Sequence, residues 1–194
     1  MNSIQAFVAY LKSIYPAISA EAIQYLCSNI HSFELSPKST IIELNSLQEA
    51  LYFMHKGLAQ AYYIDEKGNE NNIRFVSANG WITHYSALLD NSPSKYTFES
   101  LEHSVLVSLP YKTIVEGYKM YADLEKLGRL IAENILIEQQ KRIESFQFLS
   151  AEERYLQFLH SYPKLANRIS ISHLSSYLGI KRQSLTRIRK NLLS

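Results

Sequence analysis

The hydrophobic period of the chain changes once, near residue 112, and this change limits the possible folds more than any other feature of the sequence. Residues 31–110 form short apolar or alternating runs separated by turn residues, a pattern typical of antiparallel strands in a sandwich or barrel. From 112 to 147 the apolar residues recur at helical spacing instead. A chain that switches in this way is expected to be an α+β protein, with strands and helices in separate parts.

The change of period divides the chain into three expected parts. These are an N-terminal antiparallel β-barrel or jelly roll with preceding helices at 1–111, a long helix at 112–147 and a compact helical unit at 148–194. Within the first part, residues 57–76 predict a β-hairpin, because two β-rich runs flank a polar stretch in which Gly68 can adopt a positive φ. Gly57 is expected at a tight turn or a close approach of two backbones.

Capping residues indicate where individual helices begin. Ser19 is a candidate N-cap for a helix within residues 1–30, and Pro16 separates that helix from an earlier short helix. Ser150 is a second candidate N-cap, and Glu153 stands at the position that completes a capping box.

The long helix predicted at 112–147 has one apolar face. Some thirty helical residues span about 45 Å at 1.5 Å per residue, which is more than a small core covers alone. We therefore expect a second subunit to cover this face, and the chain to be a homodimer. The alternative is an amphipathic helix that docks on the barrel of its own chain. The dimer residues expected on this face are Leu124, Leu127, Ile131 and Ile135.

Positive charge is concentrated at the C-terminal end, although the net charge of the whole chain is only +2. Residues 151–194 contain 8 Lys and Arg against 2 Asp and Glu, and no acidic residue occurs from Arg154 to Ser194. The same segment is rich in Leu, Ile and Tyr at helical spacing. It therefore indicates a folded basic module, of the kind that binds nucleic acid, and not a charged tail.

The last 25 residues have the pattern of a helix-turn-helix with its second helix at 182–193. Gly179 stands in the turn, where a positive φ is needed, and Ser175 is small where two helices must approach. The positions expected to be apolar and inward-facing are Leu174, Leu178, Ile180, Leu185 and Ile188.

The remaining positions of this unit are polar or cationic, which is what docking in the DNA major groove requires. Arg182 and Arg187 can each pair bidentately with guanine, and Gln183 can pair with adenine. The further residues expected to contact double-stranded DNA are Ser170, Ser172, His173, Lys181, Ser184, Arg189 and Lys190.

Two segments resemble the CRP/FNR family of cyclic-AMP-receptor-type bacterial transcription regulators. The segment ALYFMHKGLAQAYYIDEKGNE is similar to the family's strand–glycine–hairpin signature, and HLSSYLGIKRQSLTRIRKNL is similar to its DNA-reading unit. The resemblance covers nearly the whole chain. It implies a cyclic-nucleotide-binding-like jelly roll, a dimerisation helix and a winged-type helix-turn-helix. It also implies a homodimer on a palindromic operator with half-sites about 34 Å apart, and reading roles for Arg182, Gln183 and Arg187. RNA polymerase is a further expected partner.

One stretch departs from the cyclic-nucleotide binders of that family. They carry Gly-Glu for the ribose and Arg-Ser for the phosphate, whereas His84-Tyr85 and Ser94-Lys95 stand at the matching positions here. Lys95 supplies a charge but not the planar fork of an arginine. We therefore expect no cyclic-AMP binding by the usual geometry. The residues that could line a pocket for another small-molecule effector, or pack it shut, are Arg74, Trp81, His84, Tyr85, Lys95 and Tyr96.

Other classes of function find little support in the sequence. The single cysteine, Cys27, excludes an internal disulfide, and neither a membrane span nor a signal peptide is evident, so a cytoplasmic protein is expected. No nucleophile motif or phosphate-cradling loop is present, so no enzyme, cofactor or metal is expected. The alternatives are a cupin-like metal enzyme that uses His55, His84 and His103, and a ligand-sensing module that does not bind DNA.

Overall fold

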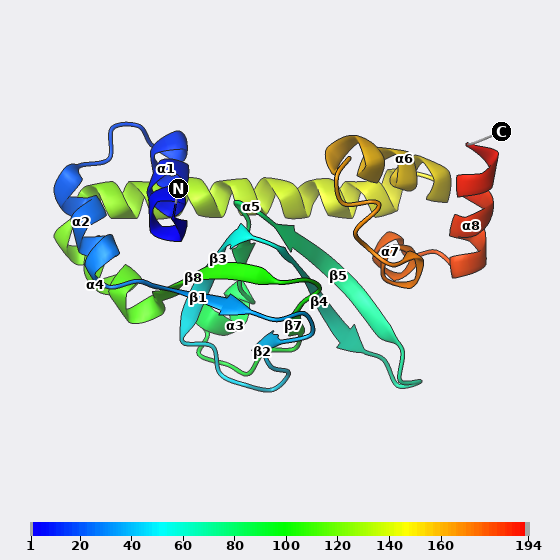
Figure 1. Ribbon diagram of the computed structural model, residues 1–194, viewed down its shortest axis with the longest axis horizontal. Helices are drawn as coiled ribbons and strands as arrows, with labels where there is room; N and C mark the ends of the chain where they lie inside the picture. Colours follow the sequence, from blue (N-terminus) through cyan, green and yellow to red (C-terminus); the bar gives the residue numbers. More distant parts are fainter. Residues whose placement is uncertain (1, 193–194) are drawn as a thin grey trace. The chain divides into compact units, whose positions relative to one another are not determined.

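The structure is a computed structural model that describes residues 2–192 of the 194-residue chain (Figure 1). Its residues form two compact units. Unit 1 comprises Met1–Ala61 and Phe75–Asn134, and unit 2 comprises Tyr62–Arg74 and Ile135–Ser194. The tip of the predicted β-hairpin therefore groups with the C-terminal helices and not with the remaining strands.

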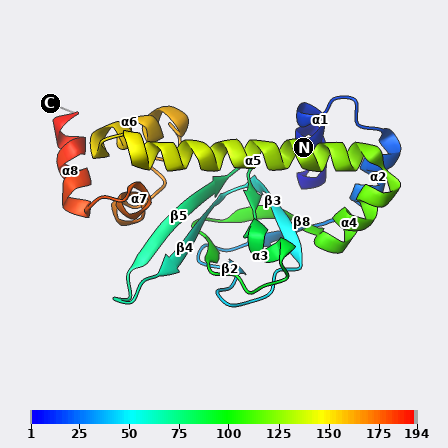
Figure 2. The same ribbon diagram turned by 180° about the vertical axis from the view of Figure 1, so that it is seen from behind.

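Eight strands form two antiparallel four-stranded sheets, seen from the two sides in Figures 1 and 2. The first sheet has the order β1-β8-β3-β6 and consists of β1 (His31–Leu35), β8 (Ser104–Pro110), β3 (Ala50–Lys56) and β6 (Trp81–Ile82). The second has the order β2-β7-β4-β5 and consists of β2 (Thr40–Ile42), β7 (Thr97–Ser100), β4 (Leu58–Ile64) and β5 (Glu70–Ser77). The expected jelly roll is confirmed as two open sheets, which do not close into a barrel.

The core of unit 1 is apolar and aromatic. Phe7, Phe53 and Trp81 are buried and meet edge to face, with ring centroids 5.3 to 5.9 Å apart. Gly57 has a φ of 111°, and a Cβ there would lie 2.7 Å from the Cα of Ser104. The close backbone approach expected at Gly57 is thus confirmed, and only glycine fits there.

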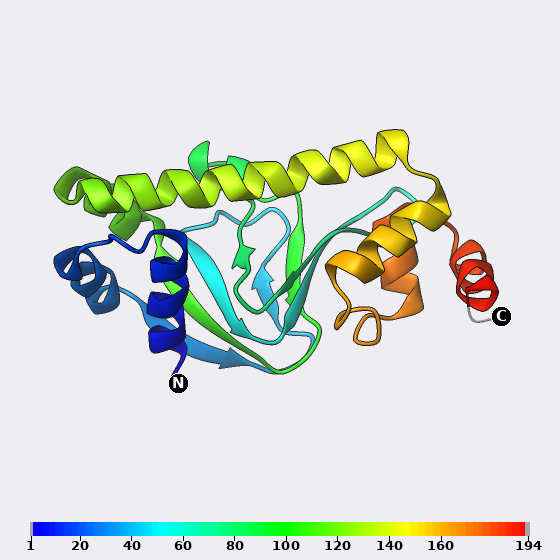
Figure 3. The same cartoon turned by 90° about the horizontal axis from the view of Figure 1, so that it is seen from above.

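Three short helices accompany these strands: α1 (Ser3–Ile14), α2 (Ala20–Ser28) and α3 (Tyr85–Leu89). The hydroxyl of Ser19 accepts a hydrogen bond from the amide of Ala22, which confirms Ser19 as the N-cap of α2. Figure 3 shows α1 and α2 beside the first half of α5. There the amide of Ser19 donates to the Asp123 carboxylate at 2.8 Å.

The single helix predicted at 112–147 is two helices, α4 (Tyr111–Met120) and α5 (Ala122–Phe148). The break lies at Tyr121, which has an extended backbone with φ −133° and ψ 107°. Its ring packs on Tyr25 of α2, with centroids 5.4 Å apart. Gly117 also approaches the Tyr25 ring and Leu124, so that a Cβ on Gly117 would lie within 3 Å of both. Packing between distant segments therefore interrupts a sequence whose local pattern favours one helix.

Unit 2 contains the second half of α5 together with α6 (Ala151–Ser161), α7 (Ile171–Leu178) and α8 (Arg182–Asn191). The capping box at the start of α6 is confirmed, since Ser150 and Glu153 exchange hydrogen bonds with each other's backbone amides. Residue 193, the expected end of the last helix, lies outside the described residues. Between 111 and 192 the structure has helices and loops but no strand, so these residues do not contain the expected wing.

No helix in the described part of the chain combines the length and the apolar character needed to cross a bilayer.

Candidate nucleic-acid interface

The helix-turn-helix predicted at the C-terminal end is present as α7, a turn and α8. Gly179 occupies the left-handed region with φ 65°, and its amide hydrogen-bonds the carbonyls of Ser175 and Ser176. Leu174 and Leu185 are fully buried between the helices, and Ser175 is 4% exposed. The turn glycine, the small residue and the apolar spacing identified in the sequence are therefore confirmed.

The outward side of α8 carries cations and no acid. Lys181, Arg182, Gln183 and Arg187 are exposed, whereas Leu185 and Ile188 face inward. Neither Arg182 nor Arg187 forms an ion pair with any other described residue. We call Lys181, Arg182, Gln183 and Arg187 the cationic face. Its side chains have donors to spare for phosphates and base edges.

Arg189 points away from the cationic face, toward the interior of unit 2. Its Nε donates to the Tyr155 hydroxyl at 3.1 Å, and one terminal nitrogen lies 3.4 Å from the Ala166 carbonyl oxygen. Its guanidinium also lies 5.6 Å from the centroid of the Tyr155 ring. Instead of the expected DNA contact, Arg189 thus forms hydrogen bonds to α6 and to the loop that follows it. The helical spacing indicates this inward position, because Arg189 follows the buried Leu185 by four residues and therefore lies on the same face of α8.

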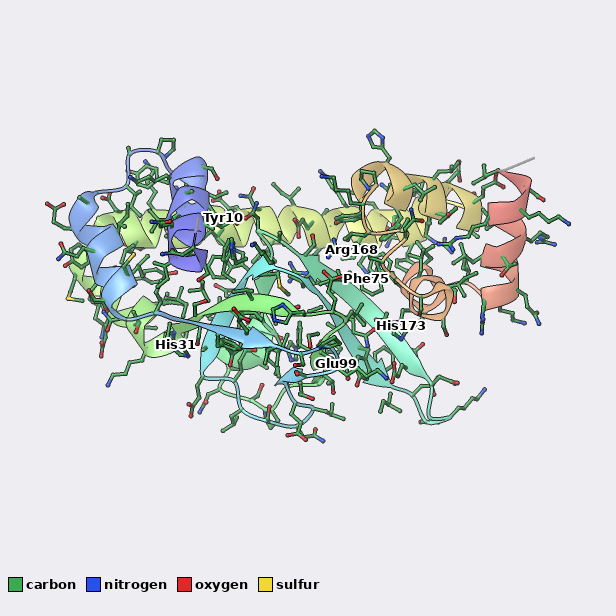
Figure 4. All side chains as sticks on the ribbon, viewed as in Figure 1. Tyr10, His31, Phe75, Glu99, Arg168 and His173 are labelled. Atoms are coloured by element: carbon green, nitrogen blue, oxygen red, sulfur yellow. The ribbon has the colours of Figure 1, made fainter. Side chains whose placement is uncertain are left out.

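The expected contacts at the start of α7 are partly occupied. The Ser170 hydroxyl caps α7 by accepting the amide of His173 at 3.1 Å, while Ser172 is exposed. His173, labelled in Figure 4, has its Nε2 3.7 Å from a Glu70 carboxylate oxygen of the hairpin. Of the other expected contacts, Ser184 is half-buried and Lys190 is exposed.

The hairpin tip docks on α7 through hydrogen bonds that the sequence did not indicate. The Ser176 hydroxyl accepts the amide of Asn72 at 2.8 Å and donates to the carbonyl of Glu70 at 3.1 Å. The two partners are more than 100 residues apart from Ser176 in the chain. No local pattern could have paired them.

Two arginines hold the C-terminal end of α7, and sequence analysis missed both. One terminal nitrogen of Arg142, on α5, donates to the Tyr177 carbonyl at 3.0 Å. Arg154, on α6, donates from Nε to the Leu178 carbonyl at 3.0 Å and from a terminal nitrogen to the Leu149 carbonyl at 2.8 Å. Helix C-termini leave carbonyls without intrahelical partners, and these guanidiniums satisfy them.

The polar residues that replace the cyclic-nucleotide ligands are bonded to one another in unit 1. His84 Nδ1 lies 3.3 Å from the Ser94 hydroxyl and Nε2 lies 3.1 Å from the Ser86 hydroxyl. The amide of His84 donates to Gln48 Oε1 at 2.9 Å, and its ring packs on Tyr96 with centroids 4.7 Å apart. We call Gln48, His84, Ser86, Ser94 and Tyr96 the closed cassette. Burial, and then the nearby charge of Lys95, lower the pKa of His84, which favours the neutral imidazole.

The six residues expected around an effector pocket are divided between the two units. Trp81 is 4% exposed in the aromatic core, and its Nε1 donates to the hydroxyl of Tyr10, which Figure 4 labels on α1. Arg74 belongs to unit 2, where it lies 3.5 Å from Glu138. His84 and Tyr96 belong to the closed cassette. Tyr85 and Lys95 are exposed beside it.

The histidines of the metal-enzyme alternative are dispersed. His103 is exposed and pairs with Glu34 at 3.1 Å, His84 is bonded to two serines, and burial lowers the pKa of His55. Among the described residues, no group of three His, Cys, Asp or Glu side chains is placed to hold a metal ion.

The apolar residues of α5 divide into a covered and an exposed set. Leu124 and Leu127 are each 3% exposed and belong to the interior of unit 1, so they are not available to a second subunit. Ile131 and Ile135 are half-buried. The exposed apolar side chains come later in the helix, at Leu136, Ile137, Ile143, Phe146 and Phe148.

Comparison with known proteins identifies the fold. The profile of the cyclic nucleotide-binding domain matches residues 32–121. Among curated proteins, no sequence matches the chain. Three solved structures illustrate the similarity. FixK2 from Bradyrhizobium japonicum is 15% identical, with a TM-score of 0.72 over 84% of both chains. The c-di-GMP-responsive global regulator CLP from Xanthomonas campestris is 14% identical, with a TM-score of 0.71 over 90% of this chain and 92% of its own.

The third is a protein assigned to the crp/fnr family of transcriptional regulators, from Eubacterium rectale. It is 14% identical, with a TM-score of 0.72 over 93% of this chain and 86% of its own. At this identity the similarity concerns the fold, and it extends over the strands, the long helix and the C-terminal helices alike. Residues 32–121 therefore match the profile of the cyclic nucleotide-binding domain, and the chain as a whole has the fold of the CRP/FNR-type regulators that its sequence resembles.

Proposed function

We propose that this protein is a sequence-specific DNA-binding transcription regulator that acts as a homodimer and does not respond to cyclic AMP. The observation that carries the proposal is the division of α8 into two sides. Leu185 and Ile188 are buried, while the cationic face is exposed and has no acidic neighbour on α7 or α8. A helix of this kind suits the major groove, where its first turn meets base edges and flanking cations neutralise phosphates.

The test of DNA binding is a salt titration. The purified protein would first capture duplexes from a genomic library. Its affinity for these duplexes would then be measured by fluorescence anisotropy at increasing salt concentrations. We expect log affinity to fall linearly with log salt, by roughly 0.9 for each phosphate contacted. A protein with Lys181→Ala should bind more weakly and show a shallower slope. Lys112→Ala, which removes an exposed cation of α4 in unit 1, is the matched control. Absence of salt-dependent binding to any duplex would contradict the proposal.

The homodimer is supported by the exposed apolar side chains of α5. Leu136 is 68% exposed, and Ile143 follows it by seven residues, so the two lie on the same face after two helical turns. Ile137, at 51% exposure, widens this face. Apolar residues gathered on one helix face are typical of an interaction surface. We infer that the corresponding face of a second α5 covers them, further along the helix than the residues chosen from the sequence.

Light scattering of the double variant Leu136→Asp, Ile143→Asp tests this interface. We expect the mass of a dimer for the unchanged protein and of a monomer for the variant, because the carboxylates would be buried without partners in the dimer. Leu156→Asp, at an exposed apolar residue of α6, is the control and should remain dimeric. A monomeric unchanged protein, or a dimeric double variant, would count against the interface.

The absence of a cyclic-AMP response is supported by the closed cassette. A cyclic phosphate needs a cationic fork and free donors. Here the Ser94 hydroxyl donates to the Tyr96 carbonyl at 2.8 Å, and Gln48 is engaged by Thr83, Ala50 and His84. Calorimetric titration with cyclic AMP should show no saturable heat, and millimolar cyclic AMP should leave the melting temperature unchanged. A saturable heat would refute this part of the proposal.

A further inference from the structure

Unit 2 contains a cavity of about 280 Å³ where the end of α5 meets α6 and α7. Its lining is unusual in combining cations with aromatic rings. The charged residues that line it are Lys141, Arg142, Arg154 and Glu138, and the rings are those of Phe146, Phe158, Tyr162 and Tyr177. The cavity is separate from the cationic face and from the closed cassette, because no residue of either one lines it.

The charges around this cavity are unbalanced. Its one carboxylate, Glu138, already has a cation 3.5 Å away in Arg74, which is not part of the lining. Lys141, Arg142 and Arg154 have no carboxylate within ion-pair distance among the described residues. Burial lowers the pKa of the Arg142 guanidinium, as expected for a cation removed from water without a counter-ion. A partly buried cation without an anion is a cost that a bound anion would offset.

The two guanidiniums also have unused donors. Each guanidinium carries five N–H groups. Arg142 uses one, on the Tyr177 carbonyl, and Arg154 uses two, on the carbonyls of Leu178 and Leu149. The Arg142 guanidinium lies over the Tyr177 ring, with its carbon 3.9 Å from the ring centroid and 4.9 Å from the centroid of the Phe146 ring. The planar fork is therefore preorganised, which is the geometry that carboxylates and phosphates recognise.

We propose that this cavity is a binding site for a small organic oxyanion, a carboxylate or a phosphate. The volume argues for a compact ligand, since pockets for drug-sized molecules occupy roughly 300–1,000 Å³. The aromatic walls accommodate a small planar body, while Lys141, Arg142 and Arg154 receive the charged group.

The position of the site suggests what its occupation does, and this step rests on the proposed function. Arg142 and Arg154 hold the carbonyls at the end of α7, and Phe146 packs on the turn, where a Cβ on Gly179 would lie 2.7 Å from its ring. An oxyanion that binds the unused N–H donors draws the same two guanidiniums away from those carbonyls. Its binding therefore changes how α7, and with it α8, is held at the end of α5. The site would act as an effector site for DNA binding.

Calorimetric titration of the intact protein without DNA tests the site. The probes are inorganic phosphate and, separately, benzoate. We expect one saturable site per chain for at least one of them, and the probe that binds shows whether phosphate or carboxylate is the preferred group. The dissociation constant should rise about tenfold or more in Arg142→Gln, because a charge-assisted hydrogen bond is lost. Lys141→Gln, at an exposed residue outside the α7 cap, should weaken binding without altering the fold.

One control variant makes the result decisive. Lys190→Gln changes an exposed cation of α8 and should leave binding of the probe unchanged. No saturable binding of either probe would overturn the proposal, as would binding that survives Lys141→Gln and is lost in Lys190→Gln. The effector role is read separately, as a change in DNA affinity on addition of the bound probe. An unchanged DNA affinity would overturn the role. Anion binding without DNA binding would leave the site standing and refute the proposed function instead.

Discussion

The closed cassette and the cationic face use similar polar side chains in opposite ways. In the closed cassette, Gln48, His84 and Ser94 satisfy one another and the local backbone, and burial favours the uncharged imidazole. On α8, Arg182 and Arg187 are exposed, and neither has an ion-pair partner among residues 2–192. The first region bonds its own polar groups, whereas the second leaves its hydrogen-bonding capacity unused.

This difference shows that residue type alone does not mark a binding site. In the domain that resembles a nucleotide-binding domain, the polar side chains of the closed cassette bond to one another. The cationic side chains with unused hydrogen-bond donors lie in unit 2. A site is better recognised by donors and charges that the protein itself does not satisfy. Four predictions test this contrast.

The largest effect is expected from Gln48→Ala in the closed cassette. The Gln48 side chain donates to Ala50 and Thr83 and accepts the amide of His84, and the residue is 9% exposed. Removing it leaves several buried groups without partners, each worth about 1–3 kcal/mol. We expect the free energy of unfolding in urea to fall by about 3 kcal/mol. Gln24→Ala, at an exposed position of α2, should change it by less than about 0.5 kcal/mol, and equal losses would show that the network contributes nothing.

Arg182→Ala should affect DNA binding and leave stability unchanged. We expect a loss of about 1–3 kcal/mol in binding free energy at one base pair of the operator, with relaxed preference at that position. Anisotropy with single-base variants of a captured site measures this. An equal loss on every sequence would make Arg182 a phosphate contact and not a base reader.

Arg187 and Arg189 provide the same contrast within one helix. Arg187→Ala should weaken DNA binding at unchanged stability, because its side chain is exposed. Arg189→Ala should lower the free energy of unfolding by about 1 kcal/mol, because the bonds to Tyr155 and Ala166 are lost. Urea unfolding and anisotropy on both variants separate the two roles, and a stability loss in Arg187→Ala would contradict them.

The smallest effect concerns the pH dependence of stability. The folded-state pKa of His84 lies below its ordinary value of 6.5. Between the two values the unfolded chain binds more protons, so the His84 contribution is complete above pH 6.5 and falls as the pH drops below it. Thermal unfolding from pH 7.5 to 5 should show a slight destabilisation that His84→Gln reduces. An unaltered pH profile in that variant would exclude His84 as the source.

The sequence by itself determined the features that depend on near neighbours in the chain. The change of hydrophobic period, the caps at Ser19 and Ser150, and the turn at Gly179 are each set within about four residues, by backbone sterics and side-chain spacing. The same spacing produced the two sides of α8. It also predicts that Arg189 points inward, since positions two apart on a helix, such as Arg187 and Arg189, point in nearly opposite directions.

Only the tertiary structure decided which polar groups were already used. The break at Tyr121 depends on Tyr25, the dock of Ser176 on Asn72 spans 104 residues, and the bond from Arg142 to Tyr177 spans 35. The exposure of Leu136 and the burial of Leu127 likewise depend on what the rest of the chain covers. Local propensity sets where a side chain points, but its partners come from segments that the fold brings together, and those partners determine whether it remains free to bind.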